Sequence, residues 1–143
     1  MKEKIKDLFS EGDGYLKDAK TLFFANEDRQ NIGSCNCCEA VKRYIDAYEK
    51  YLFEKISPSK NYHVVMHTIE QKDPNFKKFN DVIYEIKCFA DEARKEPESF
   101  FLYDDEIDDV LKNVLKIRNY IASKVHINEE FMHEFSNNDI MAI

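Results

Sequence analysis

The sequence predicts an all-α fold, an up-and-down bundle of four main helices with one or two short extra helices. Three observations lead to this prediction. Only 3 glycines and 3 prolines occur among the 143 residues, which leaves few turn residues for a sheet. Apolar residues recur three and four positions apart, as they do on one face of a helix. The hydrophobic fraction of 43%, with 11 Phe and 8 Tyr, is enough to fill a core.

The first helical segment covers about residues 2–26. Gly12 and Gly14 interrupt its apolar pattern, and each glycine weakens a helix by roughly 1 kcal/mol. Either the helix is continuous and weak there or, as we expect, a short lead-in helix ends near Phe9 and the helical pattern resumes after a break. Residues 26–28 predict a turn.

The second segment covers about residues 29–56 and has a core-facing stripe with helical spacing. The stripe consists of Ile32, Cys35, Cys38, Val41, Ile45, Tyr48 and Leu52. The helix should end before Pro58, because the residue that precedes a proline avoids helical backbone angles. A short third helix is expected over residues 62–71.

Asp73 and Pro74 predict the start of the fourth segment, because Asp caps helices and Pro tolerates the first helical position. This helix should end near Lys95. Asp104 is the expected cap of the last main helix. The apolar stripe of that helix is Ile107, Val110, Leu111, Val114, Ile117, Ile121 and Val125. We expect one domain over residues 1–135, with a small last helix from about residue 128, and a loosely ordered tail over residues 136–143.

The chain is acidic, with a net charge of −7 from 21 basic and 28 acidic residues. Such a charge repels a nucleic-acid backbone at long range, which argues against non-specific coating of nucleic acid but permits a local basic pocket. The sequence has no run of 18 apolar residues and no charged-then-apolar signal segment. We therefore expect a cytoplasmic protein that does not enter a membrane and keeps its cysteines reduced.

Three of the four cysteines are crowded together as Cys35, Cys37 and Cys38. They could bind a soft metal with His63 or His67, but a zinc site needs four ligands at tetrahedral geometry. Nothing in the sequence brings the two groups together, and cysteine is also a common small core residue. We predict no metal site and no cofactor.

Two further residues are candidates for ligand binding. His63 follows a loop and begins the short third helix, where it either satisfies backbone groups or lies at the edge of a pocket. Arg94 lies at the end of the fourth segment, where its charge suits the negative end of the helix dipole. The alternative for Arg94 is phosphate binding near the aromatic connection of residues 100–103.

Arg118, Asn119 and His126 come closest to a catalytic pattern. An arginine can hold a phosphate while a histidine moves a proton, which is a chemistry that serves RNA cleavage. From Arg118 to His126 a helix rises about 12 Å and rotates about 80°, so the two side chains do not converge on one phosphate. We interpret Arg118 as a solvated residue beside the apolar stripe, still able to hold an anion. The alternative is a metal-independent RNase that uses Arg118 and His126, for example across a dimer.

Four stretches, in their order and spacing, carry a family resemblance. They are Gly14-Tyr15-Leu16-Lys17-Asp18-Ala19-Lys20, the segment 38–48, Pro58 followed by His63, and Ala93-Arg94 with Pro97. Over about residues 14–125 the chain resembles the HEPN family, small helical proteins named after a nucleotide-binding domain of higher eukaryotes and prokaryotes. Members commonly dimerise and often pair with a small nucleotidyltransferase, sometimes as a toxin–antitoxin couple.

The resemblance implies a homodimer that binds a nucleotide, an RNA or a nucleotidyltransferase chain without catalysis. The residues expected to do so are His63, Arg94, Arg118 and Asn119. RNase members carry a histidine sooner after the Arg-Asn pair, where this chain has Ser123 and Lys124. Asp46 stands where the family often has Lys, and Lys95-Glu96 replaces the tyrosine ahead of Pro97. A third alternative is a structural or regulatory helical module with no nucleotide role.

Overall fold

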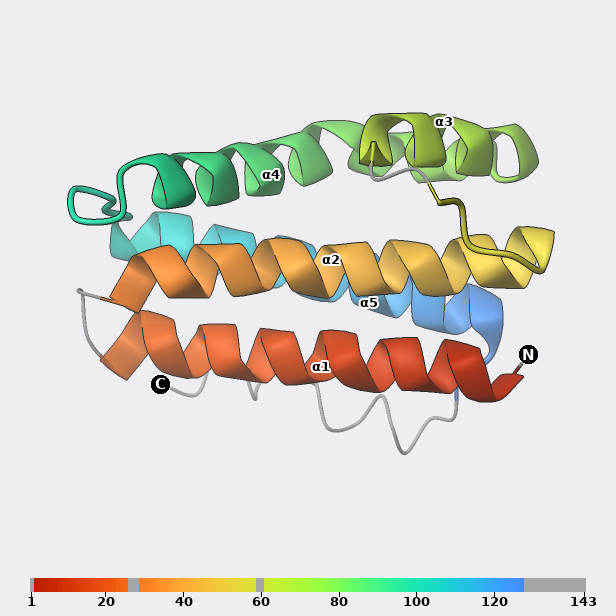
Figure 1. Cartoon of the computed structure of the whole chain (residues 1–143), viewed down its shortest axis with the longest axis horizontal. Helices are drawn as coiled ribbons and strands as arrows, with labels where there is room; N and C mark the ends of the chain where they lie inside the picture. The colour runs from red at the N-terminus through yellow and green to blue at the C-terminus, as the bar shows by residue number, and fades with distance from the viewer. Residues whose placement is uncertain (1, 26–28, 59–60, 128–143) are drawn as a thin grey trace.

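The computed structural model describes residues 2–25, 29–58 and 61–127 (Figure 1). The α-helices are α1 (Lys2–Ala25), α2 (Gln30–Phe53), α3 (Tyr62–Lys72), α4 (Asn80–Lys95) and α5 (Asp104–Val125), and a 3-10 helix, η2, covers Pro74–Phe79. No strand occurs in these ranges, which confirms the all-α class. The four long helices run along the long axis of the molecule, and each runs opposite to the long helix before it in the chain (Figure 1).

Helix α1 is continuous, so the predicted break after Phe9 is wrong. The reason lies in packing against α2. A Cβ atom on Gly12 would lie 2.6 Å from the ring of Tyr44, so the absence of a side chain lets the two helices approach closely. Asp13, between the two glycines, is buried and accepts a hydrogen bond from the Tyr44 hydroxyl at 2.6 Å. Burial of the apolar face of α1 offsets the intrinsic weakness of its glycines.

The two glycines of α1 lead to a paired prediction. A Cβ on Gly14 would meet no atom within 4 Å, whereas one on Gly12 would collide with a fully buried ring. We expect Gly14→Ala to raise the free energy of unfolding by about 0.5–1 kcal/mol, and Gly12→Ala to lower it by about 1–2 kcal/mol. Urea denaturation followed by circular dichroism measures both. A similar gain in the two variants would contradict the close approach.

Helix α2 ends at Phe53, earlier than the expected end near residue 56. Glu54 takes a left-handed backbone conformation with φ of 62°, and its N–H still bonds back to Lys50. The predicted stripe of α2 is partly wrong, because Ile32 is 42% exposed and Cys35 is only partly buried. Four residues of the predicted stripe are buried, namely Cys38, Val41, Ile45 and Tyr48, and the buried face of α2 also includes Cys37 and Tyr44.

Asp73 does not cap a helix through its side chain, which corrects the prediction made from the Asp-Pro pair. Pro74 begins the 3-10 helix η2, and α4 starts only at Asn80. The Asp73 carboxylate instead accepts two hydrogen bonds at 2.6 Å, from the hydroxyls of Tyr48 on α2 and Tyr120 on α5. One carboxylate thus connects α2 and α5 to the segment between α3 and α4.

Helix α5 is buried as predicted, since all seven residues of its expected stripe belong to the core. Its N-cap is Tyr103 rather than Asp104, and the Tyr103 N–H donates to the Glu106 carboxylate at 2.9 Å. This bond satisfies one of the backbone donors at the start of the helix. The small last helix from residue 128 and the tail over residues 136–143 lie outside the described residues.

Candidate functional site

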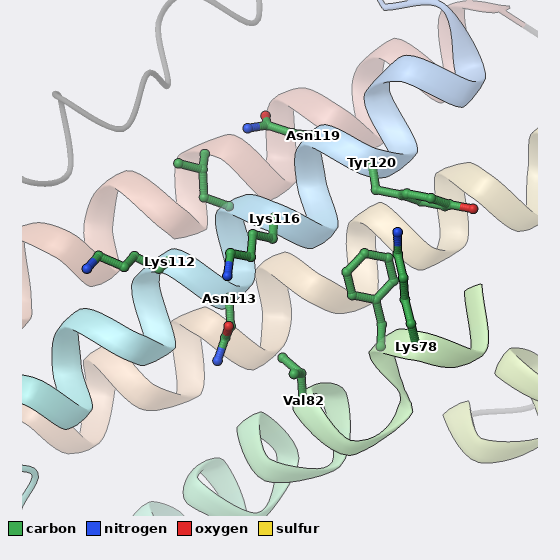
Figure 2. Close-up of a pocket in the computed structure, with 9 residues that line it drawn as sticks. Lys78, Val82, Lys112, Asn113, Lys116, Asn119 and Tyr120 are labelled. Atoms are coloured by element: carbon green, nitrogen blue, oxygen red, sulfur yellow. The ribbon is translucent and has the colours of Figure 1, made fainter. Parts of the chain in front are cut away.

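A cavity of about 770 Å³ lies between α5 on one side and η2 with the start of α4 on the other. We name it the lysine groove. Its lining residues are Lys78, Phe79, Val82, Lys112, Asn113, Leu115, Lys116, Asn119 and Tyr120. In Figure 2, Asn113 and Val82 point toward one another across the space between α5 and α4, and Lys78 extends toward Tyr120.

The periodicity of α5 explains why its polar residues gather at this cavity. The apolar stripe of the helix faces the core, so the residues three and four positions apart on the remaining face share one surface. Lys112 and Lys116 are one turn apart there, with Asn113 and Asn119 beside them. Lys78 comes from the last turn of η2, a segment that is distant in sequence.

The charges of the lysine groove are all positive. In the described part of the chain, no carboxylate lies within 4.0 Å of the ammonium groups of Lys78, Lys112 or Lys116, and no Asp or Glu lines the cavity. Ammonium groups without a nearby carboxylate attract anions, and the low-dielectric walls of a groove strengthen that attraction. The lysine groove is therefore a local cationic site on an acidic protein with a net charge of −7.

Arg118 is fully buried, with an exposed fraction of 0%, so the expectation of a solvated arginine is wrong. Its guanidinium donates to both carboxylate oxygens of Asp13, through Nε at 2.7 Å and through a terminal nitrogen at 3.2 Å. The other terminal nitrogen donates to the side-chain oxygen of Asn119 at 2.9 Å. Burial, with the Asp13 carboxylate beside it, also raises the pKa of Tyr44 well above its ordinary value. Arg118 thus stabilises the core and orients Asn119.

The orientation of Asn119 matters for the groove. Because the oxygen of its amide accepts from Arg118, its NH₂ group is left as the donor. Asn119 is the only one of the four predicted ligand-binding residues that lines the lysine groove. None of the three lysines of the groove was predicted from the sequence. The sequence did contain one signal for an unpaired positive charge, because Lys116 has no acidic residue three or four positions away on its helix.

His63 and Arg94 lie together in a second cavity, of about 540 Å³, between α2, α3 and α4. The lysines and the arginine that line it, Lys42, Lys87 and Arg94, each lie within 4.0 Å of a carboxylate. Arg94, with a side chain 44% exposed, lies 3.3 Å from Asp91 and 3.9 Å from Glu39. Its partners offset its charge, so this cavity has a weaker attraction for anions than the lysine groove. The four residues predicted to bind a ligand therefore lie in two places. His63 and Arg94 share this cavity, whereas Arg118 and Asn119 are neighbours on α5.

Arg118 and His126 are held at different parts of the bundle. Arg118 contacts Asp13 in the middle of α1, whereas His126 lines a cavity with Ile5 and Lys6 from the start of that helix. Asp13 and Ile5 are eight residues apart, which is about 12 Å along a helix. His126 packs edge-on against the ring of Tyr51, with centroids 6.3 Å apart. Within a single chain, Arg118 and His126 therefore do not come together as the RNase alternative would require.

The cysteines are not gathered with histidines. In the described ranges, no three His, Cys, Asp or Glu side chains lie where they could hold one metal ion. Cys37 is fully buried, and burial raises the pKa of its thiol, which disfavours the thiolate that a metal requires. Cys35 directs its sulfur toward the backbone oxygen of Ala90 at 3.9 Å. Cys37 and Cys38 pack in the core of the bundle.

Comparisons of the chain with protein-family models, with curated proteins and with solved structures found no match. None of the helices in the described part of the chain is long and apolar enough to span a membrane.

Proposed function

We propose that this chain is a HEPN-like helical module that binds the phosphate groups of a nucleotide in the lysine groove and catalyses no reaction. The observation that carries the proposal is the set of three lysines without a nearby carboxylate, placed around one cavity. Lysine binds phosphate as a point charge, and its ammonium offers three hydrogen-bond donors. The NH₂ group of Asn119 adds a donor whose direction is set by Arg118.

The size of the ligand follows from the charge of the protein. A long polyanion would meet the overall negative field of a chain with net charge −7, whereas a small ligand meets mainly the local cations. The proposal therefore names a nucleotide rather than a long RNA. The homodimer and the nucleotidyltransferase partner, with their toxin–antitoxin context, stay predictions of the family resemblance. Light scattering of the purified chain tests the dimer.

The binding test uses titration calorimetry with ATP at low ionic strength. We expect the double variant Lys112→Gln/Lys116→Gln to bind ATP at least about tenfold more weakly, because each hydrogen bond to a charged group contributes about 1.5–3 kcal/mol. Higher salt should weaken binding to the unaltered protein, because salt screens exposed charges.

Lys77→Gln is the matched control, since Lys77 is exposed on the same 3-10 helix as Lys78 but does not line the groove. It should bind ATP nearly as the unaltered protein does. The proposal fails if the unaltered protein shows no heat with millimolar ATP, or if the double variant and the control bind equally. Circular dichroism of each variant checks that the helices are intact.

A further inference from the structure

The aromatic wall of the lysine groove offers no open ring face to a nucleotide base. Phe79 is only 8% exposed, and the ammonium of Lys78 lies 5.2 Å from the centre of its ring. Tyr120 packs edge-on against Phe79, with centroids 5.1 Å apart. Base recognition by stacking requires an accessible ring face, which Phe79 lacks.

The ring of Tyr120 is also occupied. The ammonium groups of Lys78 and Lys124 lie over it, at 4.7 Å and 5.4 Å from its centre, and its hydroxyl donates to Asp73 at 2.6 Å. Burial, together with this hydrogen bond to Asp73, raises the pKa of Tyr120, so its hydroxyl stays protonated. A base that stacked on this ring would have to displace an ammonium, and a cation over an aromatic face contributes about 0.5–2 kcal/mol.

The polar lining of the groove is rich in donors. Lys78, Lys112 and Lys116 donate hydrogen bonds but cannot accept them, and the free end of the Asn119 amide is a donor. A phosphate chain presents acceptor oxygens only and therefore fits this lining. The edge of a base presents both donors and acceptors, and Asn113 is the one lining side chain with an amide oxygen that no described group engages.

The groove also supplies positive charge but no anionic metal ligand. Mg²⁺ in nucleotide sites is usually held by one or two carboxylates along with the phosphates, and no carboxylate of the described residues lines this cavity. The lysines would therefore neutralise the phosphate chain directly. Because Mg²⁺ lowers the negative charge of a nucleotide, its complex should bind to the lysines more weakly than the metal-free nucleotide.

We infer that the lysine groove recognises a polyphosphate chain and leaves the base in solvent, an inference that rests on the proposed function. The ligand class is then a diphosphate or triphosphate, and nucleoside triphosphates with different bases compete equally with inorganic tripolyphosphate. Lys112 and Lys116, one turn apart, line the groove from α5, and Lys78 lines it from η2.

Calorimetry with four ligands, in buffer that contains EDTA, tests the inference. ATP, GTP and inorganic tripolyphosphate should bind with affinities within about threefold, and adenosine should give no heat at millimolar concentration. Replacing EDTA with excess Mg²⁺ should weaken the binding of ATP severalfold. Asn113→Ala should change the affinities for ATP and GTP by the same factor.

Two outcomes overturn the inference in different ways. If ATP binds more than tenfold tighter than GTP or tripolyphosphate, the groove reads the base, and the inference fails while the proposed function stands. If none of the phosphate ligands binds, both fail. Lys112→Gln/Lys116→Gln shows where binding occurs, because it should weaken every phosphate ligand at least tenfold.

Discussion

Asp13→Ala should lower the free energy of unfolding by about 3–5 kcal/mol, because it leaves a buried guanidinium without its carboxylate. Arg118 is fully buried and makes two hydrogen bonds to Asp13, at 2.7 Å and 3.2 Å. The change also removes the acceptor of the Tyr44 hydroxyl, which is held at 2.6 Å in the same network. Urea denaturation of the full chain measures the loss.

An exposed ion pair that also involves α1 provides the control. Arg43 on α2 lies 3.0 Å from Glu11 on α1, and the Glu11 side chain is more than half exposed. Exposed pairs contribute about 0–1 kcal/mol, so Glu11→Ala should have a small effect. A second variant distinguishes the free-energy cost of an unpaired buried guanidinium from the cost of removing the Asp13 side chain. Asp13→Leu with Arg118→Met removes both charges, and should be more stable than Asp13→Ala. Equal losses for Asp13→Ala and Glu11→Ala would contradict the buried network.

Asp73→Ala should lower the free energy of unfolding by about 2–4 kcal/mol, because it removes an ionised acceptor from two tyrosine hydroxyls. Tyr48 is buried and Tyr120 is partly buried, and both donate to Asp73 at 2.6 Å. Tyr48→Phe removes a single donor and should therefore lose about 1 kcal/mol. If the two variants are equally stable, Asp73 does not join the three segments.

The contribution of Asp73 should depend on pH. Burial by itself raises the pKa of this carboxyl, but the hydrogen bonds from Tyr120 and Tyr48, with the nearby Lys124 charge, outweigh burial and lower the pKa. A carboxyl with a lowered pKa in the folded state stabilises the fold above its unfolded pKa of about 3.9, and that stabilisation is lost as the pH falls through the folded value. The stability difference between the unaltered protein and Asp73→Asn should therefore shrink below about pH 4. A constant difference from pH 7 to the acid range would contradict the lowered pKa.

The fold could be predicted from the sequence wherever the spacing of apolar residues alone determines which face of a helix is buried. All seven residues of the predicted stripe of α5 are buried, because apolar residues at helical spacing from Ile107 to Val125 leave one arrangement for the buried face. The predicted break in α1 is wrong because the helix packs at Gly12 against Tyr44, which lies 32 residues further along the chain. Glycine propensity is a local property, and packing against another helix outweighs it.

The site was harder to predict than the fold for a related reason. Arg118 has a polar, flexible side chain that normally lies in solvent, and its carboxylate partner lies 105 residues earlier in the chain. The lysine groove combines Lys78 with Lys112 and Lys116, and only the folded chain places these segments side by side. His63 and Arg94 do share a cavity, but their position in the sequence does not show that Asp91 and Glu39 offset the arginine charge.

The Asp13–Arg118 pair has a consequence for the order of folding. Helices α1 and α2 follow one another in sequence and pack along their length, so they can associate with little loss of chain entropy. The contact between Asp13 and Arg118 spans 105 residues, and must wait until α5 has reached α1. Interactions that form after the folding transition state act mainly on the unfolding rate. The buried pair should therefore govern how long a folded molecule persists rather than how quickly it forms.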